Sequence, residues 1–225
     1  MKNNLQRSIL YVATISIGLL LSSTAFFGFT KGIVAEMIVS LFVWALFIKI
    51  YRTTDRKERV EMITVLAFAT PMELFFSEIW LIYEYQRGLM PLFVPAGHYF
   101  LFDLGRICVK YLNNNITFLG LLPLIPFVMY GWYDGSDTSA ILLLLFVLTF
   151  IHYGRESQLY VVMVWLALAM ELWGTYLMNW TWSNDVPWTG LTAWNPPLLV
   201  GAFYCLGDLL VVWSVAKFES KPRVR

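Results

Sequence analysis

The sequence predicts an all-α, polytopic membrane protein, and its composition and hydropathy support that fold class. Of the 225 residues, 59% are hydrophobic and only 14% are charged, whereas soluble domains are close to half apolar and about one quarter charged. The mean hydropathy of the whole chain is +0.64. A soluble globular domain, a disordered chain and a disulfide scaffold are therefore excluded. The formal net charge of +1 gives no basis for nucleic-acid binding.

Eight hydrophobic segments account for most of the chain and are predicted to cross the bilayer. A spanning helix needs about 20 mostly apolar residues, and in lipid the backbone must bond internally, which favours helices over open strands. The predicted spans are residues 8–28, 33–51, 60–85, 92–110, 116–132, 138–153, 159–182 and 197–217. The sixth is short, and the fourth contains Asp103 and Arg106, which are expected to pair with each other. The connections leave no room for a soluble domain.

The distribution of positive charge orients these spans. With eight spans, both termini and the loops after even-numbered spans share one side, which holds all of the 16 lysine and arginine residues except Lys31 and Arg87. Because lysine and arginine accumulate in cytoplasmic loops, we expect cytoplasmic termini and a bacterial or archaeal plasma membrane. Ser23-Thr24-Ala25 is similar to a signal-peptide cleavage site, but the apolar run before it is long for a signal peptide and favours a retained helix.

The two halves of the sequence share a pattern that predicts an internal repeat, with one four-helix unit in residues 1–113 and another in 114–225. Met72-Glu73-Leu74 recurs 98 positions later as Met170-Glu171-Leu172. In both halves this triplet is followed by aromatic residues, a polar loop, a proline-containing helix start and a Tyr-x-x-x-Asp motif. An even number of spans in each half predicts parallel repeats related by an axis along the membrane normal. Chance similarity between tryptophan-rich helices is the alternative.

Glu73 and Glu171 are the two carboxylates expected deepest in the membrane. An ionisable side chain there costs several kcal/mol and usually faces a partner or a cavity. Helical periodicity places Glu73 on one face with Trp80 and Glu84, and Glu171 on a matching face with Trp182. If the faces meet, two carboxyl groups share an aromatic-lined interior, where a neutral carboxylic acid is a usable proton donor. The alternative is an interhelical hydrogen bond that only locks the bundle.

His98, Glu84 and a set of aromatic residues complete the candidate site. Pro91 and Pro95 resist regular helix and place His98 near the start of the fourth span, where it is expected to exchange a proton with Glu84 or Glu73. A histidine bonded to a backbone carbonyl is the alternative. The candidate substrate-binding residues are Trp80, Tyr85, Trp173, Trp180, Trp182 and Asn195. An interfacial aromatic belt would also explain most of them.

The sequence gives no expectation of a metal or cofactor. The only histidines are His98 and His152, predicted near opposite faces of the membrane, and no di-iron pattern is present. Cys108 and Cys205 both lie in apolar runs and form no zinc motif or disulfide framework.

The motifs around the glutamates resemble those of the integral-membrane carotenoid hydratases and the heterodimeric-type lycopene cyclases. Members of that group are small, duplicated helical proteins with a Pro-x-Glu type motif in each half. Pro71-Met72-Glu73 matches it, Ala169-Met170-Glu171 lacks the proline, and the run from Trp80 to Pro95 is similar to the hydratase pattern of aromatics, glycine and Val-Pro. The adjacent acidic pair common in the cyclases is absent. The resemblance implies protonation of a polyene double bond without redox change.

Three functions remain open from the sequence. The first is a cofactor-independent enzyme that hydrates, cyclises or isomerises a lipid-soluble, isoprenoid-type substrate, with Glu73 as proton donor, Glu171 as its partner and tryptophans that stabilise a carbocation. The second is a small proton- or cation-coupled transporter. The third is a structural or assembly subunit whose polar residues only pair helices. The bilayer is a partner in each, and the oligomeric state stays open.

Overall fold

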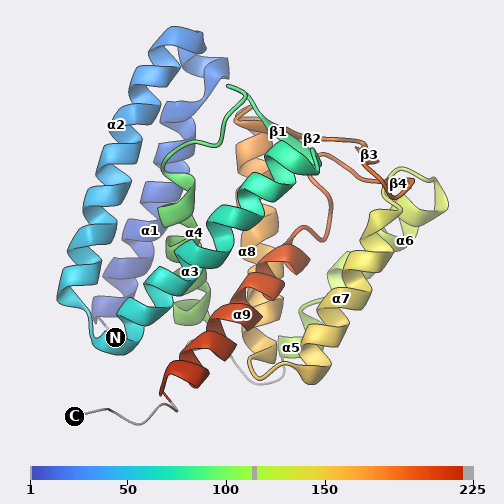
Figure 1. Cartoon of the computed structure of the whole chain (residues 1–225). Helices are drawn as coiled ribbons and strands as arrows, with labels where there is room; N and C mark the ends of the chain where they lie inside the picture. The colour runs from blue at the N-terminus through green and yellow to red at the C-terminus, as the bar shows by residue number, and fades with distance from the viewer. Residues whose placement is uncertain (1, 113–115, 220–225) are drawn as a thin grey trace.

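Helices form most of the chain in the computed structural model, which describes residues 2–112 and 116–219. In chain order they are α1 (Lys2–Ser22), α2 (Thr24–Thr53), α3 (Arg56–Leu74), α4 (Val94–Val109), α5 (Ile116–Leu119), α6 (Ile125–Tyr133), α7 (Ser139–Tyr153), α8 (Ser157–Tyr176) and α9 (Gly201–Glu219) (Figure 1). A single π-helical turn, Phe75–Ile79, continues α3. The predicted helical class is therefore confirmed. The predicted boundary between the two halves falls on residues 113–115, outside the described residues.

Five helical segments of the described chain are long and apolar enough to cross a membrane. They are Asn4–Ser22, Lys31–Thr53, Arg56–Ile79, Ser157–Tyr176 and Gly201–Phe218. The other predicted spans also coincide with helices, but α4 has 16 residues and α7 has 15, so a count of eight spans is not confirmed. The fifth predicted span is broken into α5, a 3₁₀ turn and α6. Pro123 and Pro126 explain this break, because proline removes a helical N–H donor and clashes with the preceding turn.

The third and seventh predicted spans end earlier than expected. The helices stop at Ile79 and Tyr176, and the aromatic residues beyond them form strands β1 (Tyr83–Tyr85) and β2 (Trp180–Trp182). Each segment leaves its helix through a residue with a left-handed backbone, Leu81 (φ 58°) and Met178 (φ 57°). The run of tyrosine, tryptophan and threonine that follows favours extended structure.

Strands β1 and β2 pair in antiparallel fashion and so join the two halves of the chain. Tyr83 lies opposite Trp182, and Tyr85 lies opposite Trp180. A second short hairpin pairs β3 (Asp185–Val186) with β4 (Leu191–Thr192). These strands lie at one end of the bundle, whereas the α2–α3 and α7–α8 connections lie at the other end (Figure 1).

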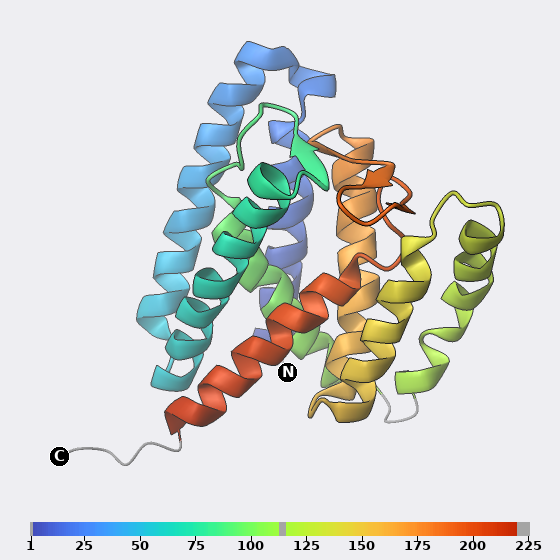
Figure 2. The same ribbon diagram turned by 45° about the vertical axis from the view of Figure 1, so that its right-hand side comes forward.

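Four helices surround the interior below β1 and β2. Helices α3 and α8 each pack against both α4 and α9, and α1 and α2 cover α4 on the outside of this group (Figure 2). Helix α8 is the most central, because it also contacts α1, α5 and α7. Helices α3 and α8, which precede β1 and β2, therefore share α4 and α9 as neighbours.

Ion pairs between helices hold the end of the bundle opposite the strands. Arg7 of α1 lies 2.8 Å from the carboxylate of Asp103 on α4 and also pairs with Glu58 of α3. Arg106 of α4 pairs with Glu61 of α3. The expected pairing of Asp103 with Arg106 is therefore wrong, since each finds an opposite charge on a neighbouring helix.

Candidate active site

Two cavities adjoin one polar cluster in the interior. The first cavity extends between α1, α2 and α4, and the second between α3 and α9. Their volumes are about 80 and 70 Å³, enough for several water molecules in each. The residues that line both cavities form the shared cluster: Glu73, Tyr83, His98, Glu171, Trp182 and Tyr204. Beyond this cluster the walls are mostly aliphatic and aromatic.

Glu73 of α3 is held by both tyrosines of β1. Its Oε2 accepts hydrogen bonds from the hydroxyls of Tyr83 and, at 2.5 Å, of Tyr85. Burial and the adjacent Glu73 carboxylate raise the pKa of both phenols, so both keep their protons. The Ser77 hydroxyl donates to the Glu73 carbonyl at 2.9 Å, within the π-helical turn that follows. One carboxyl oxygen of Glu73 is thus fully engaged, and the other is left for a different partner.

His98 is that partner, and its bonding fixes where a mobile proton lies. Its Nδ1 is 2.9 Å from the carbonyl oxygen of Val94, and because a carbonyl only accepts, Nδ1 must carry a hydrogen. Its Nε2 is 3.0 Å from Oε1 of Glu73. Either Nε2–H donates to a carboxylate or a protonated Glu73 donates to Nε2. In both cases one proton lies between Glu73 and His98.

Glu171 of α8 has an analogous environment with different donors. Its Oε2 accepts from the indole Nε1 atoms of Trp180 and Trp182, at 2.7 and 2.9 Å. Indole nitrogens only donate, so a proton on Glu171 would reside on Oε1. The hydroxyl of Tyr204 on α9 lies 3.3 Å from this Oε1.

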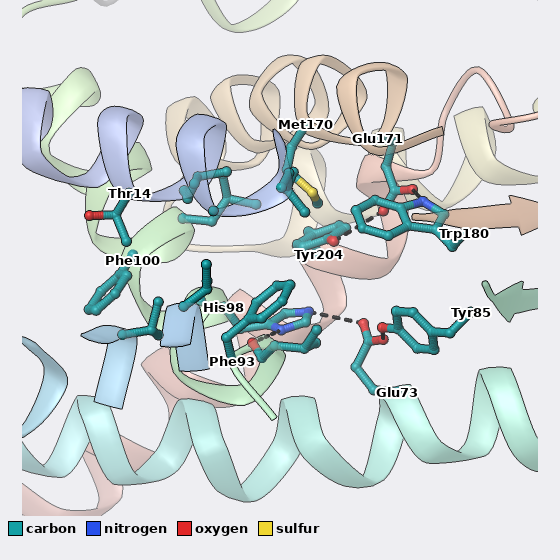
Figure 3. A pocket seen from close by; sticks show the side chains of 18 of the residues that line it. Thr14, Glu73, Tyr85, Phe93, His98, Phe100, Met170, Glu171, Trp180 and Tyr204 are labelled. Carbon is teal, nitrogen blue, oxygen red and sulfur yellow. Dashed lines mark hydrogen bonds and ion pairs between the residues drawn. The ribbon is translucent and has the colours of Figure 1, made fainter. Parts of the chain in front are cut away.

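The two carboxyl groups face each other across the first cavity. Glu73 extends from α3 and Glu171 from α8 toward the same space (Figure 3), close enough to interact electrostatically. Their partners also meet, because the rings of His98 and Tyr204 are stacked, with centroids 5.6 Å apart and planes 13° apart. The structure therefore brings Glu73, Glu171 and His98 together, with Tyr85, Trp180 and Trp182 against the carboxylates.

The remaining predicted site residues lie outside the two cavities. Glu84 is exposed on the opposite face of β1, because side chains alternate along a strand. The indole of Trp80 donates to the Pro187 carbonyl at 2.7 Å. The half-exposed Trp173 donates to the Ser16 carbonyl at 3.2 Å. Asn195 accepts from the backbone N–H of Trp182 at 2.9 Å and so positions β2 rather than lining a cavity.

Two residues of the cluster, Tyr83 and Tyr204, are not among the site residues that the sequence predicts. Tyr83 belongs to a run in which tyrosines alternate with Glu84, and this period of two is a strand signal that could have identified it. In the sequence, Tyr204 stands out only as the tyrosine of the second Tyr-x-x-x-Asp motif. Its contact with Glu171 depends on how α9 packs on α8, which no local pattern reports.

Comparisons with protein-family models, with curated proteins and with solved structures found no match to this chain. A fold alone does not define a function, whereas the geometry and chemistry of a site can support one. The functional argument therefore rests on the cluster and its cavities.

Proposed function

We propose that the protein is an integral membrane enzyme that performs cofactor-independent acid–base chemistry on a lipid-soluble, isoprenoid-type alkene. The observation that carries this proposal is the pair of glutamates in one largely apolar cavity, each with Oε2 bound by two donors and Oε1 directed at a titratable side chain. A helix-locking role needs only one such hydrogen bond. Ionisable groups at membrane depth usually mark a functional site.

The proton between Glu73 and His98 is the one transferred to the substrate. Its addition to one carbon of the double bond leaves a carbocation on the other carbon. The rings of Tyr83, Trp180 and Trp182 line the first cavity, and aromatic rings stabilise positive charge by cation–π attraction. Glu171 then removes a proton from a neighbouring carbon, or activates the water that adds to the cation. Isomerisation and cyclisation return the proton that was used, and hydration adds one water, so none of these needs an oxidant or a reductant.

The cavity walls favour a slender hydrocarbon as substrate. Ile15 and Leu19 of α1 and Val39 of α2 line the first cavity. Phe68 of α3 and Phe76 of the π-helical turn line the second. Burial of such surfaces gives roughly 25 cal/mol per Å² and favours apolar ligands without fixing their polar groups. The resemblance of Pro71-Met72-Glu73 to carotenoid hydratases and cyclases agrees with an isoprenoid substrate of this shape.

A duplicated architecture explains why the two carboxylates have parallel surroundings. The left-handed residues Leu81 and Met178 precede β1 and β2 at the same spacing, and each strand supplies two donors to the glutamate of its own half. We propose parallel repeats of α3–β1–α4 and α8–β2–α9 within an eight-span topology. The lysine and arginine distribution supports cytoplasmic termini and a plasma-membrane location.

A proton- or cation-coupled transporter is the second candidate function. The observation that favours it is the position of the ionisable cluster between two cavities, which is where a coupling site would lie. A transporter would move a solute or protons across vesicle membranes, whereas the proposed enzyme would change the chemical structure of a lipid.

The test is mass spectrometry of lipids extracted from cells that express the wild type, Glu73→Gln or Glu171→Gln at equal membrane levels. Glu78→Gln is the matched control, because Glu78 is exposed and follows Glu73 on the same segment. We expect a lipid species that changes with the wild type and the control but with neither cavity variant. An unchanged lipid profile, with proton-coupled uptake that depends on Glu73, would replace the enzyme with the transporter.

A further inference from the structure

A third carboxyl group, Asp208, lines the second cavity and has no role in the proton transfer described above. It lies on α9 and is only 4% exposed. Its Oδ2 is fully buried and has no hydrogen-bond partner among the described residues. A buried acceptor without a partner loses its hydration and gains nothing in return, so such a group usually has a ligand, a water or a chemical task.

The neighbouring side chains do not satisfy Asp208. The Tyr204 hydroxyl is directed at Glu171, and the Cys205 thiol is 3.3 Å from the Tyr160 carbonyl oxygen. The Tyr160 hydroxyl is itself buried and finds no hydrogen-bond partner within residues 2–112 and 116–219. Arg106 and His98 are near enough to act electrostatically on Asp208, but Arg106 pairs with Glu61 and His98 with Glu73. A cationic ligand at Asp208 would lie near the positive charge of Arg106 and the proton shared by His98. A neutral hydrogen-bond donor therefore fits better.

The position of Asp208 relates it to the reacting carboxylates. It follows Tyr204 by four residues, which is about 6 Å further along the helix axis. Apolar side chains also line the second cavity, among them Phe102, Phe203 and Val211. A ligand in the second cavity therefore meets a hydrogen-bond acceptor at Asp208 and also reaches Glu73 and His98, which line the same cavity.

We propose that the second cavity binds a lipid alcohol, with its hydroxyl donating to Asp208 while its double bond lies against Glu73 and Glu171. This assignment rests on the proposed function and narrows its substrate class to isoprenoid-type alcohols. Asp208 fixes how far the chain enters, and so determines which double bond meets the carboxylates.

The test is equilibrium binding of tritiated farnesol and tritiated farnesyl methyl ether to the purified full chain in phosphatidylcholine nanodiscs, with empty nanodiscs as the partition blank. The two probes share their hydrocarbon chain, but only the alcohol donates a hydrogen bond. We expect the wild type to bind farnesol about ten-fold more tightly than the ether, as one hydrogen bond to a buried carboxyl oxygen predicts.

Variants separate recognition by Asp208 from other roles. Asp208→Leu should abolish the preference for the alcohol and leave ether binding unchanged, whereas Asp208→Asn, which keeps an acceptor oxygen, should retain a preference above about three-fold. Ser214→Ala, on α9 outside the described linings of both cavities, should behave as wild type. Glu73→Gln should also keep the preference, because binding needs no turnover.

Three results would overturn the proposal. They are equal wild-type affinity for the two probes, an unchanged preference in Asp208→Leu, and no saturable binding of either probe. Equal wild-type affinity and the absence of saturable binding are both measured on the wild type. They test the proposal even if Asp208→Leu folds poorly. Loss of alcohol conversion in Asp208→Asn with its farnesol preference intact would instead make Asp208 a proton-transfer residue. If the preference holds while the lipid profile is unchanged, only the proposed reaction fails.

Discussion

Gly174 sets the position of Trp180, and its replacement by alanine is the most informative packing perturbation in the site. A Cβ at Gly174 would lie 2.8 Å from Cε2 of Trp180 and closer still to two other atoms of the indole ring. Ordinary contacts begin near 3.4 Å, so the ring must move. Trp180 is only 7% exposed and its Nε1 lies 2.7 Å from Glu171. A shift of about 1 Å would take this pair beyond hydrogen-bond distance.

We expect Gly174→Ala to lower the free energy of unfolding by about 1.5–5 kcal/mol. Overpacking contributes about 1–3 kcal/mol, and the lost hydrogen bond to a carboxylate contributes about 1.5–3 kcal/mol. The better helix propensity of alanine offsets about 1 kcal/mol of this sum. The assay is denaturant unfolding in mixed micelles, combined with measurement of lipid conversion per folded molecule.

A double-mutant cycle tests the reasoning. Trp180→Phe removes the ring atoms that clash, so Gly174→Ala should cost less than about 1 kcal/mol in the Trp180→Phe background. Lipid conversion should be low in the Trp180→Phe single variant and in the double variant. Both lack the Trp180 indole N–H that donates to Glu171. Additive effects of the two substitutions on unfolding, or full activity of Gly174→Ala, would refute the account of this contact.

Further predictions concern the other supports of the carboxylates. His98→Ala should lower the rate of lipid conversion by about 10²–10⁴-fold while farnesol binding in nanodiscs changes by less than about three-fold; a loss confined to binding would contradict the proton-transfer role. Tyr85→Phe removes one donor to Glu73 and should reduce the free energy of unfolding by about 1–3 kcal/mol, measured in micelles with Tyr111→Phe, an exposed tyrosine, as control. Arg7→Met should destabilise by about 3–5 kcal/mol, because Glu58 and Asp103 lose their cation, yet leave conversion per folded molecule unchanged; a loss of specific activity would show that this ion-pair group acts on the site.

The two glutamates and the histidine of the cluster could be identified from the sequence. Glu73 and Glu171 stand out because charged side chains interrupt otherwise apolar runs, and His98 stands out because a helix start with two prolines is unusual. Their convergence on one cavity follows from the packing of α3 and α8 against the same two helices. The sequence indicated this convergence only through the repeated Met-Glu-Leu triplet.

The ends of the helices and the long-range pairings were beyond sequence reasoning. Residues such as Trp180 and Tyr85 are common both at interfacial helix ends and in strands. For this reason the predicted spans 60–85 and 159–182 include the residues that form β1 and β2. Phe75–Ile79 became a π-helical turn and Leu81 took a left-handed backbone, neither of which has a clear sequence signal. Asp103 and Arg106 were expected to pair locally, but partners on α1 and α3 were closer.

The position of side chains on β1 had a similar cause. With the chain treated as a helix, Glu84 shared a face with Glu73. In the strand it points outward, and Tyr83 and Tyr85 point inward to the carboxylate. Side chains repeat every two residues along a strand and every 3.6 residues along a helix. The strand therefore places two tyrosine hydroxyls at the centre of the site, where a helix would place Glu84.

Transfer of a proton from Glu73 to a carbon atom is the central claim, and deuterium incorporation tests it most directly. Purified protein in nanodiscs would be incubated in D₂O with the lipid identified by mass spectrometry. The account predicts that the wild type places a non-exchangeable deuterium on a carbon of that lipid and that Glu73→Gln does not. Conversion of the lipid without deuterium on carbon, or equal incorporation by folded Glu73→Gln, would contradict it.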